Sequence, residues 1–538
     1  LHSLRPLRLC GFFWPLLAGA LALAAALVTL QWGVNGSQSP FATDVGEIQN
    51  ALPRWGTIHF TGYPLYTFLG SAWVTLWRWL GVEPAAGSSL WSALWGAAAA
   101  ALFALVAMEL GASGPLAALG ALIASLATSA WIDNSLAEIH SMTMAFTGAT
   151  LWLALRYGRT GARRDLIWLA ILFTQGVAHQ RAVAFMGLGA LILVAHRWRA
   201  IARDLPLLIG LALLAPLTYL YLPIRAWMGA DWTFGEPGTW RGFWTMILDT
   251  KAERILASPG SWSELAERGK VVAQLLRWDL PYALLIPGAL GLLTPALRRR
   301  WRESLGLILT GAPYLALCLV IWEGRISDAL LAVKLPPVYL AGVGLALWGA
   351  VRAPAAQVSG LRLQTPPSRA KNVSLCASLA DGGRLCKRSL PALAAGSSAS
   401  ESAPPRMWAG VGGLRRRAGG GRGQPDEAAP ASQPIADGSR AFSNAPRSRF
   451  RSRAYQVSLI VILIATCGGL FYAHRPDVLA ITRDPAAEAV IATVEALGPL
   501  TSLTPGPSPK GRGEPEARGE GVLPLPLGEG RSEGAEVT

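Results

Sequence analysis

Residues 11–30 read GFFWPLLAGALALAAALVTL and contain no charged side chain. A helix of about 20 residues rises roughly 30 Å, which is the thickness of the hydrocarbon core of a bilayer. A secretory signal peptide has a shorter apolar core and a small-residue cleavage site, whereas this run continues into QWGVNGSQ. Because Arg5 and Arg8 precede it, we expect an uncleaved first span whose N-terminus lies in the cytoplasm.

Ten further apolar runs follow, at residues 88–108, 115–132, 139–155, 166–180, 182–195, 205–224, 281–297, 304–322, 335–351 and 455–473. Hydrophobic residues make up 52% of the 538-residue chain and charged residues only 15%, against about 25% charge in soluble domains. This composition excludes a soluble globular enzyme and a wholly disordered chain. The expected fold class is an all-α polytopic membrane protein with about 11 spans.

The net charge of +15 is concentrated in one segment. Residues 352–454 contain 17 Lys or Arg and 5 Asp or Glu, a net charge of +12, in a low-complexity sequence rich in Gly, Ser and Pro. We expect a cytoplasmic insertion, either disordered and without a selected role or acting as a basic arm toward anionic lipid or RNA. The rest of the chain is nearly neutral, so no nucleic-acid partner is expected for the protein as a whole.

Short arginine-rich loops decide the expected sidedness, and they lie at 156–164, 197–203 and 298–302. Such loops belong in the cytoplasm. All three lie there only if residues 63–80, with Trp73, Trp77 and Trp79, form an interfacial helix and not a span. Two long loops, 31–87 and 225–280, then face outward, and chemistry is expected on that side.

The expected domains are a membrane core at 1–351, the insertion at 352–454 and a last span at 455–473. Residues 474–500 resemble the start of an extracytoplasmic domain, truncated after about residue 500. Residues 501–538, with TPGPSPKGRGE and PLPLGEG, resemble the translation of an interspersed bacterial repeat element. Because the chain begins with Leu1 and not Met, a fragment or an imprecise start is expected.

The first long loop contains the acidic pair Asp44 and Glu47 in DVGEIQ. A spacing of three residues places both on one face of a helix. Such a pair could bind a divalent metal, could take a proton from an acceptor hydroxyl, or could simply cap a helix.

Several other polar and aromatic residues lie in the outer segments. His59 and Tyr63 belong to HFTGYPLY, where Gly62 and Pro64 indicate a turn, and the aromatic rings could stack on a sugar or form an interfacial belt. The remaining candidates are Glu138 and His140 in AEIH, His179 and Arg181 in GVAHQR, Arg225 after YLYLPI, and Trp232 and Glu236 in DWTFGEPGTW. Arginine matches phosphate oxygens, although it also snorkels to the interface, and ionisable groups at membrane depth are functional candidates.

Six motifs taken in order, DVGEIQ, HFTGYPLY, AEIH, GVAHQR, LPIRA and WTFGEPGTWRGF, resemble the protein O-mannosyltransferase-like family of multi-spanning membrane proteins. The resemblance covers roughly residues 11–350 and, more weakly, 455–500. It departs from the family pattern at Phe60 and Thr61, at Ile139 and His140, and around Glu236. The family is grouped with the GT-C glycosyltransferases, so the resemblance implies a GT-C-like helical bundle.

The resemblance implies a sugar donor carried on polyprenyl phosphate and a protein or glycan acceptor. We expect an inverting glycosyltransferase in the bacterial inner membrane, with its active site outside. Asp44 would be the base, helped by Glu47 or a divalent metal, and Arg225 or Arg181 would hold the phosphate. No other cofactor is expected. The alternatives are a transporter or lipid flippase, and a catalytically inactive family remnant.

Overall fold

The computed structural model describes residues 5–248, 257–321, 328–350, 445–487, 489, 491 and 492. The expected insertion, apart from its last ten residues, and the expected tail fall outside these ranges. The long helices are α1 (Arg5–Thr29), α3 (Pro64–Trp79), α4 (Pro84–Glu109), α5 (Gly114–Ser125), α7 (His140–Thr160), α8 (Arg163–His179), α10 (Trp198–Ala212), α14 (Trp262–Asp279), α15 (Tyr282–Gly291), α17 (Trp301–Val320), α19 (Leu335–Ala350) and α20 (Ala445–Thr482). The shorter ones are α2 (Val45–Ala51), α6 (Thr128–Ser135), α9 (Gly187–Val194), α11 (Leu214–Leu217), α12 (Tyr221–Trp227), α13 (Trp240–Leu248), α16 (Thr294–Leu297), α18 (Asp328–Val333), η1 (Leu52–Arg54), η2 (Arg181–Met186), η3 (Ala195–Arg197) and η4 (Thr218–Leu220).

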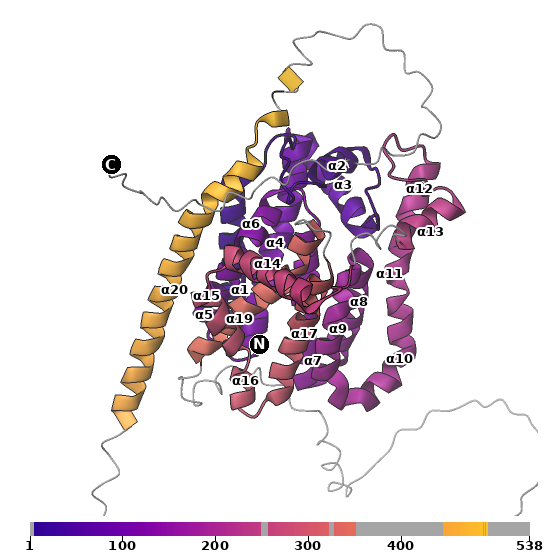
Figure 1. Cartoon of the computed structure of the whole chain (residues 1–538). Coiled ribbons are helices and arrows are strands. Elements are labelled where there is room, and N and C mark those ends of the chain that lie inside the picture. The colour runs from indigo at the N-terminus through magenta and orange to yellow at the C-terminus, as the bar shows by residue number, and fades with distance from the viewer. Residues whose placement is uncertain are drawn as a thin grey trace, which may run out of the picture. The chain divides into compact units, whose positions relative to one another are not determined.

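The predicted all-α membrane fold is confirmed, and every apolar run predicted as a span is helical (Figure 1). Six helical stretches of the described chain are long and apolar enough to cross a membrane, and a bent pair would make seven. One of the six, residues 181–227, holds two of the predicted spans. The figure of about 11 crossings therefore stays a prediction.

The stretch 181–227 folds back on itself. It starts directly after the C-terminal end of α8. It then reaches the opposite end of α8, next to the end of α7, where the His196 ring bonds the Gly158 carbonyl (2.9 Å). From there it returns to the C-terminal end of α8, where Tyr219 donates to the Ala178 carbonyl (2.6 Å). A single crossing needs only about 20 residues, so we read this stretch as two antiparallel passes.

The polypeptide alternates in this way through the bundle, so its connections gather at two ends. One end, the loop end, carries the two long connections at 31–83 and 228–281 and is joined across helices by the bond from Gln31 N to Ser135 O (3.0 Å). The opposite end, the arginine end, is joined by Arg159 to Glu109 (2.5 Å) and by Arg163 to Asp204 (3.3 Å). All three arginine-rich loops lie at the arginine end, as the predicted sidedness requires.

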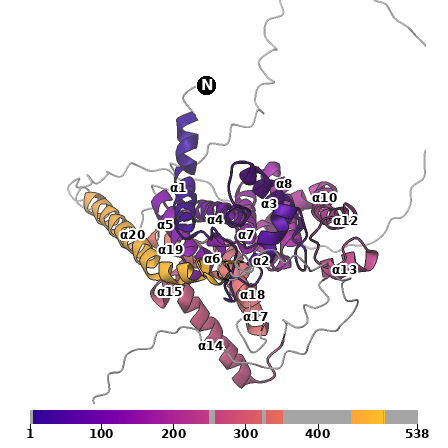
Figure 2. The same ribbon diagram turned by 90° about the horizontal axis from the view of Figure 1, so that it is seen from above.

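The packing centre of the bundle is α7 together with α4, and both lie among the other helices when seen from above (Figure 2). Most of α7 is buried although it carries a row of polar side chains, among them Thr143, Thr147 and Thr150. The Thr147 hydroxyl bonds the carbonyl of Thr143 within the helix (2.9 Å), so the helix itself satisfies this hydroxyl.

The predicted span at 115–132 is helical but broken into two helices, α5 and α6. The chain bends by 77° between α5 and α6, because Ala127 is extended (φ −59°, ψ 138°) and has no side-chain cap to offer. Partners from α14 replace the cap: Asp279 Oδ1 accepts from Ser129 N (2.8 Å), and the Thr128 hydroxyl donates to the Trp278 carbonyl (2.9 Å). Residues 150 positions away thus stabilise the start of a buried helix.

A labelling experiment tests the orientation. In a background with the five native cysteines replaced, Gln38→Cys at the loop end and Arg164→Cys at the arginine end, both at exposed positions, should react with an impermeant thiol reagent from opposite sides. We expect Gln38→Cys to label from outside. If both positions label from outside, the predicted sidedness of the arginine-rich loops fails and 63–80 becomes a span.

Candidate active site

The acidic pair of the first long loop meets a histidine. His59 Nδ1 lies 2.7 Å from Glu47 Oε2, and His59 Nε2 lies 3.3 Å from Asp44 Oδ2. The backbone N–H of His59 also donates to Glu47 Oε1 (2.9 Å). The three side chains are partly exposed, at 27% for Asp44, 17% for Glu47 and 22% for His59, so water reaches them.

Helix capping does not explain Asp44. It occupies the N-cap position of α2, yet its side chain makes no capping hydrogen bond. The carboxylate turns toward His59 instead, and so does the carboxylate of Glu47 in the first turn. Of the three roles considered for the pair, proton transfer and metal binding therefore fit the geometry better than capping.

Both ring nitrogens of His59 face carboxylate oxygens, Nδ1 that of Glu47 and Nε2 that of Asp44. A carboxylate accepts hydrogen bonds and a ring N–H donates them, so the cluster is suited to exchanging a proton. The same three residues each place one ligand atom within 4.8 Å of the others, so they could also hold a divalent cation if the direct contacts opened.

Contacts between the rings of His59, Tyr63 and His179 connect this cluster with the interior of the bundle. Gly62 (φ +82°) and Tyr63 (φ +38°) form a left-handed turn, and a Cβ at Gly62 would lie 2.9 Å from Leu222. This turn sets Tyr63 between His59 and His179, with ring centroids 5.4 and 5.7 Å away. His179 Nε2 then lies 3.2 Å from the Ile139 carbonyl, next to the second polar cluster.

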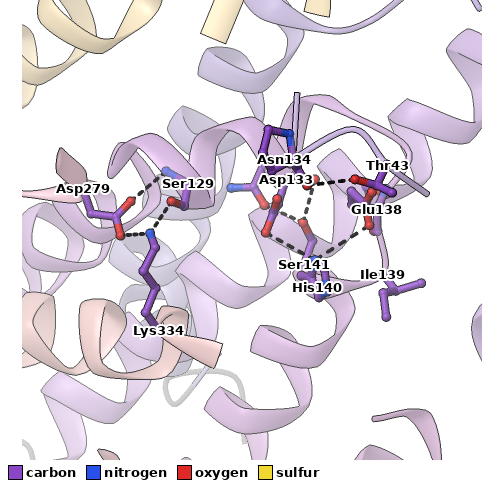
Figure 3. A network of polar contacts seen from close by, with 12 residues as sticks. Thr43, Ser129, Asp133, Asn134, Glu138, Ile139, His140, Ser141, Asp279 and Lys334 are labelled. Atoms are coloured by element: carbon purple, nitrogen blue, oxygen red, sulfur yellow. Dashed lines mark hydrogen bonds and ion pairs between the residues drawn. The ribbon is translucent and has the colours of Figure 1, made fainter. Parts of the chain in front are cut away.

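The second cluster comprises Asp133, Glu138 and His140, which surround the start of α7 (Figure 3). His140 Nδ1 lies 3.6 Å from Asp133 Oδ2 and 3.7 Å from Glu138 Oε2. All three side chains are at most 5% exposed. The structure therefore connects His59, Tyr63 and His179 with the cluster that contains Glu138 and His140.

Sequence reasoning missed two residues that support Glu138. The Tyr66 hydroxyl contacts the Ser92 hydroxyl (3.1 Å), which donates to the Glu138 carbonyl (2.7 Å) and accepts from Glu138 N (2.9 Å). Ser92 lies within an apolar run, and nothing in its local sequence signals this role. Tyr66 stood in the quoted motif, where a tyrosine can be read equally as a belt residue.

The second long loop closes over His59 through its backbone. Phe234 N donates to the Thr57 hydroxyl (2.8 Å), Thr57 N donates to the Trp232 carbonyl (3.3 Å), and the Phe234 ring lies 6.4 Å from that of His59. Trp232 packs against Gly56, so it supports the loop more than it offers a sugar-stacking face. Glu236 is exposed, and its backbone carbonyl accepts a hydrogen bond from the Thr239 hydroxyl (3.0 Å).

The two candidate phosphate-binding arginines lie at the loop end, where their guanidinium groups donate hydrogen bonds to backbone carbonyls. Arg225 donates to the carbonyls of Trp55 (2.6 Å) and Arg54 (3.4 Å), and Arg181 donates to the carbonyl of Leu248 (3.1 Å). A phosphate at Arg225 would compete with these carbonyls for the guanidinium.

Residues 44–201 match the family model described as the Protein O-mannosyl-transferase TMEM260 N-terminal domain. The resemblance to the O-mannosyltransferase-like family is confirmed over this segment. The mouse Protein O-mannosyl-transferase TMEM260 is 30% identical over 211 residues, which are 38% of this chain and 30% of the mouse protein. The chain thus matches less than a third of that relative's length.

Two solved structures of ArnT from Cupriavidus metallidurans are also similar. The apo form aligns with a TM-score of 0.43 and 14% identity, over 64% of this chain and 61% of ArnT. The form bound to undecaprenyl phosphate aligns with a TM-score of 0.42 and 16% identity, over 62% and 60%.

A buried ion pair holds the second cluster in place. Lys334 is 1% exposed, and its ammonium contacts the Asp279 carboxylate and the Ser129 hydroxyl (Figure 3). Asp279 also accepts from Ser129 N at the start of α6, and α6 carries Asp133. Breaking a buried pair leaves an uncompensated charge, which costs about 3–5 kcal/mol.

We therefore expect Lys334→Met to lower the free energy of unfolding by about 3–5 kcal/mol, measured as loss of thermal stability in detergent. The double variant Lys334→Met/Asp279→Asn should recover much of this loss, because it removes the orphaned charge and keeps an oxygen for Ser129 N. Equal stability of the single and double variants would show that the pair is not electrostatically coupled.

Proposed function

We propose that this protein is a membrane glycosyltransferase that moves a sugar from a polyprenyl-phosphate donor to an acceptor hydroxyl. The single observation that carries the proposal is the contact of Asp44 and Glu47 with His59 at the loop end. This cluster lies within the segment related to the TMEM260 N-terminal domain. The mouse relative is a protein O-mannosyl-transferase, which supports O-linked transfer here. We propose a protein or a glycan as acceptor.

In the proposed reaction the acceptor oxygen attacks the anomeric carbon and inverts it. The new bond joins that oxygen to the anomeric carbon, while the bond to the phosphate oxygen breaks and its electron pair leaves with the polyprenyl phosphate. The hydroxyl proton passes to Asp44. General-base help of this kind contributes about 100- to 10,000-fold.

Geometry favours Asp44 over Glu47 as the base. Both oxygens of Glu47 are engaged by His59, at its backbone N–H and at Nδ1. Asp44 makes the longer contact (3.3 Å) and is the more exposed of the two. Glu47 therefore orients His59, and Asp44 is the carboxylate that receives the proton in the proposed reaction.

Two faces serve two substrates in this proposal. The partly exposed cluster around Asp44 faces a water-borne acceptor, and the buried cluster around Glu138 and His140 faces a donor that enters from the bilayer. We place the active site on the outer face of the membrane, in the bacterial inner membrane that the family resemblance implies. Arg181 or Arg225 would neutralise the donor phosphate after releasing a carbonyl.

Replacement of Asp44 tests the role of the base. Asp44→Asn keeps size and hydrogen bonding to His59 but removes the basic carboxylate, so turnover should fall by at least about 100-fold while donor binding changes little. The assay is sugar transfer from a panel of polyprenyl-phosphate sugars in membranes that contain the full chain. Asp231→Asn is the matched control, since Asp231 is exposed at the same end and contacts only Arg54 (3.7 Å) among the described residues.

The same assay separates the metal role and the inactive state. If Asp44, Glu47 and His59 hold a required cation, chelator should abolish transfer by the wild type, and added divalent ion should restore it. An Asp44→Asn variant as active as Asp231→Asn would remove both catalytic roles. Absence of transfer by the wild type with every donor would favour a catalytically inactive remnant.

A further inference from the structure

A second polar pocket lies at the arginine end, far from the candidate active site. It is a cavity of about 310 Å³ between the end of α7, the η3 turn and the α16–α17 connection. Four arginines line it together with a single acidic residue; they are Arg159, Arg299, Arg300, Arg302 and Glu303.

Two of the four arginines are already neutralised. Arg159 pairs with Glu109 (2.5 Å), and Arg300 pairs with Glu303 (2.5 Å). Within the described ranges, no ion pair or hydrogen bond of the Arg299 or Arg302 side chain is found. The pocket therefore presents two guanidinium groups without a carboxylate partner, next to a local excess of positive charge.

The backbone of Arg299, one of these two arginines, is in a strained conformation. Arg299 adopts φ +61°, a left-handed conformation that side chains other than glycine rarely take. Such strain persists at sites where surrounding structure over-determines it. The helix α17 begins two residues later, at Trp301, and is 20 residues long. Its N-terminus lines the same cavity and adds partial positive charge there.

Apolar side chains around the pocket place it at a lipid boundary. Trp301 is 56% exposed, Trp198 62% and Leu297 76%, and the Arg302 guanidinium lies 5.5 Å from the ring of Trp301. Tryptophans with neighbouring arginines are typical of the membrane interface, and basic pockets between membrane helices bind phosphate head groups.

We propose that this pocket binds the phosphate group of an anionic membrane lipid in the leaflet at the arginine end. Arg299 and Arg302 supply charge-assisted hydrogen bonds to the phosphate oxygens, and Trp301 lies beside the glycerol and the start of the acyl chains. The volume suits a phosphate with a small head group. The site is independent of the sugar-transfer proposal, because it lies at the other end of the bundle.

The test is lipid binding to the purified full chain by native mass spectrometry. Phosphatidylglycerol should bind at least about 10-fold more tightly than phosphatidylcholine, and Arg299→Gln/Arg302→Gln should remove this preference. Arg164→Gln/Arg203→Gln is the matched control: it removes the same charge at the same end, from exposed arginines whose aspartates keep Arg156 and Arg163. The control should retain the preference.

Three results would overturn the proposal: equal binding of both lipids to the wild type, an unchanged preference in Arg299→Gln/Arg302→Gln, or an equal loss in the control. Competition by millimolar inorganic phosphate without any retained lipid would assign the pocket to a free anion and reject the lipid. If the double variant does not fold, Arg302→Gln alone should lose part of the preference, and an unchanged preference there would also overturn the proposal.

Discussion

The start of α6 at the loop end depends on one contact, the hydrogen bond from Ser129 N to the Asp279 carboxylate. A buried helix start must have its N–H groups satisfied, because no water reaches them. α6 begins after Ala127, which offers no cap, and Asp279 supplies the missing acceptor to Ser129 N while Lys334 balances its charge. Since α6 can start there, the chain bends by 77°, and Asp133 and the turn to Glu138 reach the candidate active site instead of continuing across the bundle.

Features of the fold that depend on local sequence could be predicted, whereas those that depend on residues far apart in the chain could not. Apolar runs of about 20 residues predict membrane helices because the bilayer constrains each run locally, and every predicted run is helical. The spacing of Asp44 and Glu47 likewise predicts a shared face. The bend at Ala127 could not be predicted, because its cause is Asp279, 150 residues away and not signalled by any local pattern. Ser92 was missed for the same reason: its partner Glu138 is 46 residues distant.

Charge divides the molecule between its two ends. The loop end gathers carboxylates and histidines, whereas the arginine end gathers guanidinium groups, several of them held by carbonyls or carboxylates. Arg197, for example, bonds the carbonyls of Gly158 (2.8 Å) and Arg159 (2.8 Å). These bonds tie the turns of the arginine end to one another, so its arginines contribute to the fold as well as to orientation. Arg299 and Arg302 differ, because neither pairs with a carboxylate or a carbonyl among the described residues.

The candidate active site joins an exposed and a buried cluster through contacts between the rings of His59, Tyr63 and His179. Asp44 lies in a region that water reaches, and Glu138 is 1% exposed. Tyr63 and His179 connect them by ring contacts at 5.4 and 5.7 Å and by the bond to the Ile139 carbonyl. Because these rings fill the space between the clusters, a movement of one cluster is transmitted as a displacement of packed side chains. In the proposed reaction, a donor bound among the buried groups and an acceptor arriving from water would meet near Tyr63, whose ring contacts both His59 and His179.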